Sequence, residues 1–424
     1  MDKPVVRISV RNLVEFILRS GDLDNRRGSA DKEAMLKGSR LHRKIQSQMG
    51  SHYRAEVSLK YTMEYDDVSI AVEGRADGIF TEDEQYFIDE IKGVYADVSQ
   101  FEKPVEVHRA QAMCYAWIYA REQQLEKIGV QMTYGNLDTE ELKYFREEFT
   151  LEELKDWYQE LLDRYHKWIS YQLAWKKERN ESMEGLEFPF EYREGQRKIV
   201  SSVYHTISAE RQIFIQAPTG VGKTMSTIFP AVRAVGAGLG ENIFYLTAKT
   251  ITRTVAEEAF LILKEHGLKF KVITITAKEK LCFCDKTECN PENCLWARGH
   301  LDRINDAVYE LWTTQDCYGR ETILEYAKKW QVCPFELCLD LAIWVDAVIC
   351  DYNYVFDPNV YLKRFFGEGT SGGYIFLIDE AHNLVDRGRE MYSAFVDRAD
   401  VLEAKKLAAD YSKGLVRALG KVNR

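Results

Sequence analysis

Four side chains between residues 38 and 115 are of the types that cut phosphodiester bonds with the help of a metal ion. His42 lies in an expected helix, Asp77 is expected at the end of a strand, and Glu90 and Lys92 stand two residues apart in the next apolar run. Alternation along a strand places Glu90 and Lys92 on one face. The imidazole and the two carboxylates could hold Mg²⁺ or Mn²⁺, and Lys92 would orient a water molecule or stabilise the developing charge.

A helix is expected to complete this group. Gln111 and Tyr115 are four residues apart and therefore share one side of that helix, where they could position a nucleic-acid backbone or Lys92. Asp89 would lie on the opposite face of the strand from Glu90, so we expect it to be structural.

A second group of residues is typical of a nucleotide site. The stretch APTGVGKT has the glycines of a phosphate-binding loop, because Gly220 and Gly222 let backbone amides approach phosphate oxygens. Lys223 should reach the β- and γ-phosphates of ATP, and the Thr224 hydroxyl should ligate Mg²⁺.

The stretch IFLIDEAHN supplies the acidic partners of that loop. Asp379, after an apolar run, would hold Mg²⁺ through water, and Glu380 would polarise the water that attacks the γ-phosphate. His382 would couple the nucleotide state to neighbouring contacts.

The cysteines predict a metal centre. Seven of nine fall between residues 282 and 338, and an odd count without a secretion signal argues against a disulfide framework. Zinc and an iron–sulfur cluster both remain open on these residues, because four thiolates suit either.

The elements that must position these groups predict an α/β chain of several domains. Net charge is −10 in 424 residues, and no stretch of eighteen apolar residues occurs, so we expect a soluble, cytoplasmic protein that needs a local basic groove to bind nucleic acid. Thr150 and Glu153 form a capping box for a long helix that ends the first domain before a charged junction at 176–189. Buried parallel strands are expected at 211–216, 242–248, 271–277, 346–352 and 374–380.

The second group resembles a superfamily 2 helicase of the DEAH kind. In that resemblance, FEYREGQ is the adenine-reading stretch, with Gln196 offering a donor and an acceptor and Arg193 or Tyr192 stacking on or flanking the base. Thr247, Lys249 and Thr250 stand where such helicases contact the single-strand backbone, although a solvated strand end is nearly as good an explanation.

The cysteine-rich insertion resembles the XPD/DinG branch of these helicases, which carries a [4Fe–4S] cluster there. Cys282, Cys289, Cys294 and Cys333 best match that branch's ligands, and Cys284 could replace Cys282 or Cys289. Cys338 and Cys350, the latter expected at the head of a strand, would be core residues.

The first group resembles the RecB-like PD-(D/E)XK nucleases, in which a His, an Asp, E-x-K and Q-x₃-Y occur in this order. The resemblances imply these parts: a PD-(D/E)XK nuclease-like α/β domain (1–180), a RecA-like parallel-sheet P-loop domain (181–281 and 341–395), an inserted iron–sulfur lobe (282–340) and the start of a helical arch (396–424).

The expected function is an ATP-dependent DNA helicase with an attached metal-dependent nuclease, acting in DNA repair or processing on DNA with single-stranded parts. Because no second RecA-like domain is recognised, we expect an N-terminal fragment that binds ATP but hydrolyses it very slowly. The alternatives are a helicase whose first domain is a non-cleaving DNA clamp, and a non-enzymatic sensor of DNA structure.

Overall fold

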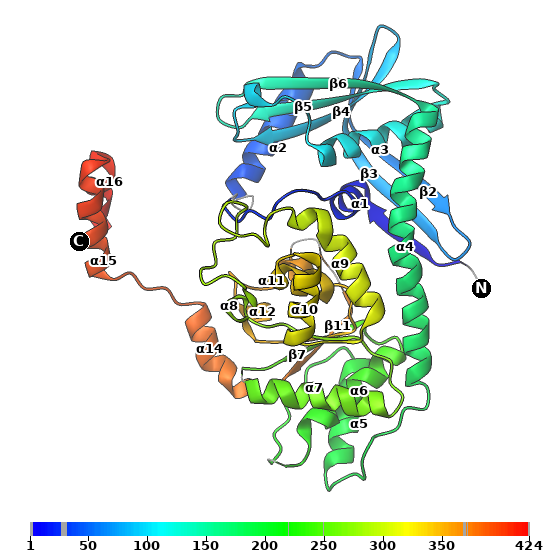
Figure 1. Ribbon diagram of the computed structural model, residues 1–424, viewed down its shortest axis with the longest axis vertical. Coiled ribbons are helices and arrows are strands. Elements are labelled where there is room, and N and C mark those ends of the chain that lie inside the picture. The colour runs from blue at the N-terminus through cyan, green and yellow to red at the C-terminus, as the bar shows by residue number, and fades with distance from the viewer. Residues whose placement is uncertain are drawn as a thin grey trace. The chain divides into compact units, whose positions relative to one another are not determined.

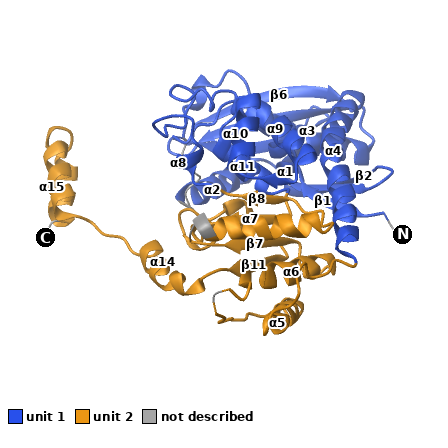
Figure 2. Cartoon of the chain, turned by 60° about the horizontal axis from the view of Figure 1, so that its bottom comes forward, with its two compact units in different colours: residues 1–184, 276–344 blue, residues 185–275, 345–424 orange. Residues whose placement is uncertain are grey.

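The computed structural model describes residues 3–26, 32–218, 220–248, 250–367, 370 and 372–422. The chain divides into two compact units, residues 1–184 with 276–344 and residues 185–275 with 345–424 (Figure 2). The cysteine-rich stretch therefore belongs to the same unit as the N-terminal part of the chain.

The first unit contains a mixed sheet with strand order β1-β3-β4-β5-β6 and with β2 paired to β3. β1 and β3 are parallel, as are β4 and β5, and the other pairs are antiparallel. Its strands and helices up to residue 184 are β1 (Val5–Ser9), α1 (Val10–Ile17), α2 (Lys32–Gln48), β2 (Tyr53–Glu64), β3 (Ser69–Glu82), β4 (Gln85–Val94), η1 (Val98–Gln100), α3 (Glu106–Gln123), β5 (Lys127–Asn136), β6 (Leu142–Thr150) and α4 (Leu151–Met183).

The strands β3 and β4 separate at the position where the candidate carboxylates lie. Their pairing runs from Glu82↔Gln85 to Gly78↔Asp89, so Asp77 and Glu90 are the first residues beyond it. The expectation that Asp77 ends a strand is wrong, because β3 continues on both sides of it and pairs with β2 there.

Helices cover both faces of this sheet. On α2, Leu41 and Ile45 are buried against Ile91 of β4, and α3 packs against β4 and β5 (Figure 1). The capping box of Thr150 and Glu153 is confirmed at the start of α4, but this helix continues to Met183, so the predicted junction is helical over most of its length.

The cysteine-rich part of the first unit is built from short helices, α8 (Lys278–Leu281), α9 (His300–Thr314), α10 (Arg320–Trp330) and α11 (Pro334–Ala342), with β9 (Cys317–Tyr318). The segment that follows α1 runs along it: Leu23 N donates to Ala297 O, and Asn25 N donates to Cys289 O, both at 2.9 Å.

An aromatic cluster joins the same two parts of the first unit. The ring centroids of Phe16 and Trp168 are 4.9 Å apart, those of Trp168 and Trp344 are 4.8 Å apart, and those of Trp312 and Trp344 are 5.0 Å apart. Beside it, Arg19 Nη1 lies 2.8 Å from Asp340 Oδ2, and both side chains are largely buried. The N-terminal helices α1 and α4 thus share a core with α9 and α11.

The second unit contains a parallel sheet in the order β11-β7-β10-β8. The elements of this unit are α5 (Gln196–Ser208), α6 (Lys223–Gly236), β7 (Asn242–Leu246), α7 (Thr250–Glu265), β8 (Val272–Thr274), β10 (Ala347–Cys350), α12 (Asn353–Phe356), α13 (Lys363–Phe366), β11 (Tyr374–Ile378), η2 (Ala381–Asn383), α14 (Leu384–Met391), α15 (Arg398–Leu407), η3 (Ala408–Asp410) and α16 (Lys413–Val422).

Four of the five expected parallel strands are confirmed as β7, β8, β10 and β11, whereas the strand expected at 211–216 is wrong. That segment is neither helix nor strand, and the side chain of Phe214 is 91% exposed. Arg211 N donates to Thr206 O in the turn that ends α5, and a short apolar run forms a strand only where a neighbour supplies hydrogen bonds. Cys350 is buried as expected but ends β10 rather than heading a strand.

A search of the described residues for a helix with the length and apolar character needed to span a bilayer finds no candidate.

Candidate functional site

The first unit contains a cavity of about 490 Å³ lined by every residue of the first predicted group. α2 contributes His42, β3 contributes Asp77, and β4 contributes Glu90 with Lys92. Gln111 and Tyr115 of α3 complete that set. The residues that the sequence motif predicted to act together therefore line the same cavity.

The floor of the cavity carries two buried oxygens that have no hydrogen-bond partner among the residues that the structure describes. They are Glu90 Oε2 and Gln111 Oε1, and both residues are at most 5% exposed. The other oxygen of Glu90 lies 2.7 Å from Lys92 Nζ. Burial raises the pKa of the Glu90 carboxyl, and the nearby Lys92 charge opposes that shift. Buried acceptors of this kind normally have a partner, so the floor is suited to receive a cation or a donor.

Asp77 is fixed beside this floor. Its Oδ2 accepts a hydrogen bond of 2.7 Å from the Ile91 backbone N–H, which is available because β3 and β4 have separated there. Its Oδ1 lies 3.5 Å from His42 Nδ1. Burial disfavours the imidazolium of His42, but the hydrogen bond and charge of Asp77 outweigh this and raise the His42 pKa.

Tyr115 occupies space that only a glycine leaves open. A Cβ on Gly74 would lie 2.6 Å from the Tyr115 hydroxyl, and that hydroxyl is hydrogen-bonded to the backbone of Arg75. The ring is thereby held against β3 at the edge of the cavity.

Asp89 has the structural role expected for the opposite face of β4. Its carboxylate accepts from the Thr133 hydroxyl at 2.6 Å, from Gln131 Nε2 at 3.1 Å and from the Tyr53 hydroxyl at 3.0 Å. It is not among the residues that line the cavity.

Sequence reasoning missed the remaining lining residues. The available signal was spacing: residues three and four from His42 on α2, and a residue two before Asp77 on β3, share faces with the predicted set. The missed residues are Arg11, Ser39, Arg43, Gln46, Glu56 and Arg75.

Neither this cavity nor the cysteine-rich part presents a preformed metal shell. Within the part of the chain that the structure describes, no three His, Cys, Asp or Glu side chains are grouped so that they could hold a metal ion. The donor types nevertheless fit Mg²⁺ or Mn²⁺, because Asp77 and Glu90 offer carboxylate oxygens and one Glu90 oxygen has no partner.

In the second unit, the phosphate-loop lysine and the acidic pair lie together. Lys223 Nζ is 3.7 Å from Glu380 Oε1 and 3.3 Å from Ala217 O. Gly222, with φ +77°, precedes α6, and Gly220 also has positive φ. The helix N-terminus and the lysine therefore converge where an anion could bind.

Thr224 and Asp379 are linked through one hydroxyl. The Tyr245 hydroxyl is hydrogen-bonded to both side chains. Burial raises the pKa of Asp379, as does the neighbouring Glu380, while Tyr245 and Lys223 oppose the shift. Glu380 has φ +50°, and one of its oxygens lies 3.4 Å from His382 Nδ1.

The predicted adenine-reading residues contact the phosphate loop. Arg193 Nη1 donates to Gly220 O, and Arg193 N donates to Gln196 Oε1 at 3.0 Å. Gln196 is 4% exposed, so the acceptor that the prediction assigned to adenine is used within the chain.

Thr247 also differs from its predicted placement. It is 2% exposed, and its hydroxyl is hydrogen-bonded to the Thr252 hydroxyl rather than presented on the surface. Lys249 lies outside the described residues, as does the side chain of Thr250.

Five of the seven cysteines of the cysteine-rich part interact in two groups, and all seven are free thiols. Cys284 Sγ lies 3.8 Å from Cys294 Sγ, and Cys282 is also hydrogen-bonded to Cys284. Cys289 is hydrogen-bonded to Lys278 and interacts with Cys333. Burial raises the pKa of Cys333 to about 11. Cys284 thus contacts two of the predicted ligands, Cys282 and Cys294.

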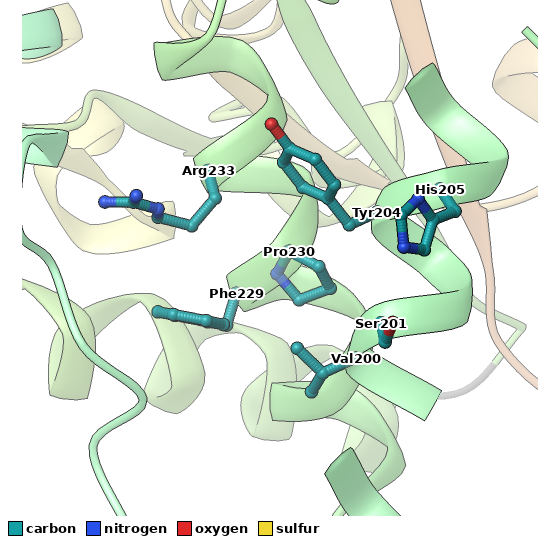
Figure 3. Close-up of a pocket in the computed structure, with 7 residues that line it drawn as sticks. All are labelled: Val200, Ser201, Tyr204, His205, Phe229, Pro230 and Arg233. Atoms are coloured by element: carbon teal, nitrogen blue, oxygen red, sulfur yellow. The ribbon is translucent and has the colours of Figure 1, made fainter. Parts of the chain in front are cut away.

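A smaller cavity of about 260 Å³ lies between α5 and α6 (Figure 3). Val200, Tyr204, Phe229 and Pro230 make its wall mainly apolar, and no carboxylate lines it. Ser201, His205 and Arg233 also line it, and without a carboxylate beside them they do not form a set of metal ligands.

Comparison with known proteins finds similarity to helicases over part of the chain. Residues 247–401, which contain the Asp379–Glu380 pair, match the DEAD_2 family model. The Fanconi anemia group J protein homolog of Gallus gallus is 29% identical over 116 residues, or 27% of this chain and 9% of that protein. A probable ATP-dependent helicase of Methanocaldococcus jannaschii is 23% identical over 236 residues, or 54% of this chain and 34% of that protein.

A solved chain named XPD helicase is 18% identical, with a TM-score of 0.36, and the match covers 55% of this chain and 39% of that one. This chain spans about a third or less of the length of the two curated relatives.

Proposed function

We propose that the chain is part of an ATP-dependent DNA helicase, acting in DNA repair or processing, that also carries a metal-dependent nuclease site. The observation that supports the proposal is the grouping of the predicted residues in each unit: His42, Asp77, Glu90 and Lys92 line one cavity of the first unit, and Lys223 lies near Glu380 in the second. The DEAD_2 match supports the motor, and the cavity of the first unit supports the nuclease.

In the motor unit, Lys223 and the N-terminus of α6 bind the β- and γ-phosphates of ATP. Thr224 and Asp379 hold Mg²⁺, and the Tyr245 hydroxyl keeps these two side chains in register. Glu380 orients the attacking water. In the structure Glu380 is paired with Lys223, so ATP must exchange this ion pair for contacts with its own phosphates.

In the nuclease unit, His42, Asp77 and Glu90 are the candidate ligands of Mg²⁺ or Mn²⁺. A bound metal would lower the pKa of a water molecule and neutralise the scissile phosphate. Lys92 already contacts Glu90, and it orients the nucleophile or stabilises the charge that develops. Gln111 and Tyr115 position the DNA strand or Lys92 from the α3 side.

The thiols of the first unit hold a [4Fe–4S] cluster in this proposal. Four thiolates are needed, and Cys282, Cys289, Cys294 and Cys333 are the predicted set. The contact between Cys284 and Cys294 makes Cys284 an alternative fourth ligand. The role of the cluster is structural: it ties the loop at 282–294 to the start of α11.

A second candidate function follows from the absence of a preformed metal shell among the described residues. In that case the first unit is a DNA-binding clamp that does not cleave, or part of a sensor of DNA structure. Cleavage of end-labelled single-stranded DNA in Mn²⁺ separates the candidates.

For that assay, Glu90→Gln keeps the shape of the floor but removes its charge. The matched control is Glu73→Gln, which changes a β3 carboxylate that does not line the cavity. Cleavage that is lost in Glu90→Gln and kept in Glu73→Gln supports the nuclease, and absence of cleavage in the unaltered chain supports the clamp.

A further inference from the structure

Three arginines, each from a different element, line the nuclease-like cavity and have no part in the proposed metal chemistry. Arg11 comes from α1, Arg43 from α2 and Arg75 from β3. Each can form two parallel hydrogen bonds to a phosphate group.

Arg43 and Arg75 face the same cavity as the candidate metal ligands, because they share faces of α2 and β3 with them. On α2, the lining residues Ser39, His42, Arg43 and Gln46 have the spacing i, i+3, i+4 and i+7, so they form one stripe. On β3, Arg75 and Asp77 are two residues apart and share a face. Arg43 and Arg75 therefore each lie on the same element as a candidate metal ligand.

Exposure separates the cavity into a floor and a rim. The side chain of Glu90 is 6% exposed and that of Asp77 is 17% exposed. The side chains of Arg75 and Arg11 are 65% and 73% exposed. The buried carboxylates favour binding of a cation, and the more exposed arginines favour binding of an anion.

The arginines are available to such an anion. Arg11 pairs with Glu15 at 2.7 Å and Arg75 pairs with Glu56 at 2.6 Å, but exposed pairs of this kind contribute little and exchange readily. Arg43 donates from Nε to Ser39 O at 3.2 Å, and among the described residues no carboxylate lies within ion-pair distance of it.

We propose that Arg11, Arg43 and Arg75 form a phosphate-binding rim that grips the backbone of a single DNA strand beside the phosphodiester at the carboxylate floor. This inference rests on the proposed nuclease function and names how its substrate is held. Because the whole chain has a net charge of −10, attraction for DNA at this site has to come from local groups such as these.

The size of the cavity favours one strand over a duplex. A volume of about 490 Å³ is within the range that encloses a drug-sized ligand, which is comparable in size to about one nucleotide of a strand. The three arginines would contact the phosphates of the strand near the cavity entrance, and one phosphate would lie at the carboxylate floor.

The experiment measures binding of a short fluorescent oligothymidylate to the full chain at several salt concentrations, with Ca²⁺ in place of Mn²⁺ to slow cleavage. Each arginine that contacts a single-strand phosphate should contribute about 0.7 to the slope of log affinity against log salt. Arg43→Ala should weaken binding about tenfold, since a hydrogen bond to a charged group contributes about 1.5 kcal/mol. The triple variant should lower the slope by about 2.

The matched control is Arg40→Ala, which removes the same charge from the same helix at a position outside the stripe. It should leave affinity and slope unchanged. Equal loss in Arg40→Ala and Arg43→Ala, or a triple variant with the slope of the unaltered chain, would overturn the rim. A blunt duplex of the same sequence should bind the unaltered chain and the triple variant equally, and a loss there would contradict the single-strand assignment.

Failure of the rim and failure of the nuclease have different signatures. If the chain does not cleave but the arginine variants lower the salt slope, the rim stands and the cavity is a clamp. If the chain cleaves in Mn²⁺ and the arginine variants bind and cleave as the unaltered chain does, the rim is wrong while the nuclease stands.

Discussion

Replacing Arg19 by alanine should release the segment after α1 from the cysteine-rich part of the first unit. Arg19 Nη1 lies 2.8 Å from Asp340 Oδ2, and Arg19 Nε donates to Asn305 Oδ1 at 2.8 Å. The Arg19 side chain is 20% exposed and that of Asp340 is 7% exposed, and burial lowers the pKa of Arg19 to about 10. Removal of one partner from a buried ion pair lowers stability by about 3–5 kcal/mol. Because Arg19 is partly exposed, we expect a loss at the lower end of this range, about 3 kcal/mol.

The assay is hydrogen exchange of the backbone amides of Leu23 and Asn25, which donate to Ala297 O and Cys289 O. A loss of about 3 kcal/mol corresponds to roughly a hundredfold faster exchange if these amides open with the same local unit. The matched control is Arg26→Ala, because Arg26 pairs with Glu292 in the same part of the chain but at the surface.

The control should leave exchange unchanged, since exposed ion pairs contribute little. Unchanged exchange in Arg19→Ala would refute the reasoning that this buried pair holds the two parts together. Replacement of both Arg19 and Asp340 by apolar residues should restore slow exchange, because burial of the pair is itself costly.

Three further predictions concern the candidate sites. Because burial raises the pKa of Glu90, a proton must leave when Mn²⁺ binds, so Mn²⁺ affinity should fall as pH falls through that pKa; calorimetry that shows affinity independent of pH near neutrality would contradict this. Cys333→Ser should lower the iron content of anaerobically purified protein. The control Cys338→Ser changes a fully buried thiol on α11 outside the predicted ligand set and should keep the iron content. Equal iron in both variants would remove Cys333 from that set. Gly222→Ala should weaken ATP binding about tenfold or more, because φ is +77° and the new Cβ would lie 2.8 Å from Gln196 Nε2; unchanged affinity in a filter-binding assay would contradict the geometry.

Short-range patterns were sufficient to predict the candidate sites of both units in outline. Alternation placed Glu90 and Lys92 on one face of β4, and helical spacing placed Gln111 with Tyr115 on α3. The glycines before Lys223 predicted the loop with positive φ that precedes α6. These features depend on residues a few positions apart, which the sequence displays directly.

Features that depend on distant residues were not predictable in this way. Asp77 lies within a strand because β2 pairs with its neighbours Ala76 and Gly78, and nothing near Asp77 in the sequence specifies that pairing. The short apolar run at 211–216 predicts a strand, yet no described strand pairs with it. The cluster of Phe16, Trp168 and Trp344 joins residues from three separate parts of the chain, so its existence could not be read from spacing.

The arginines at the cavity illustrate the same limit. Arg43 and Arg75 share faces with His42 and Asp77, but many arginines satisfy such spacing, and only the three-dimensional structure selects these. Conversely, Thr247 and Gln196 fit their predicted motifs by position, while their burial in the structure shows that position alone does not determine exposure.

The central claim is that each unit carries its own phosphate-handling centre, and a crossed pair of variants tests it most directly. ATP binding and Mn²⁺-dependent cleavage of single-stranded DNA are measured for Lys223→Ala and for Glu90→Gln. Lys223→Ala should lose ATP binding and still cleave single-stranded DNA, and Glu90→Gln should bind ATP and not cleave. Cleavage that persists in Glu90→Gln, or ATP binding that persists in Lys223→Ala, would contradict it.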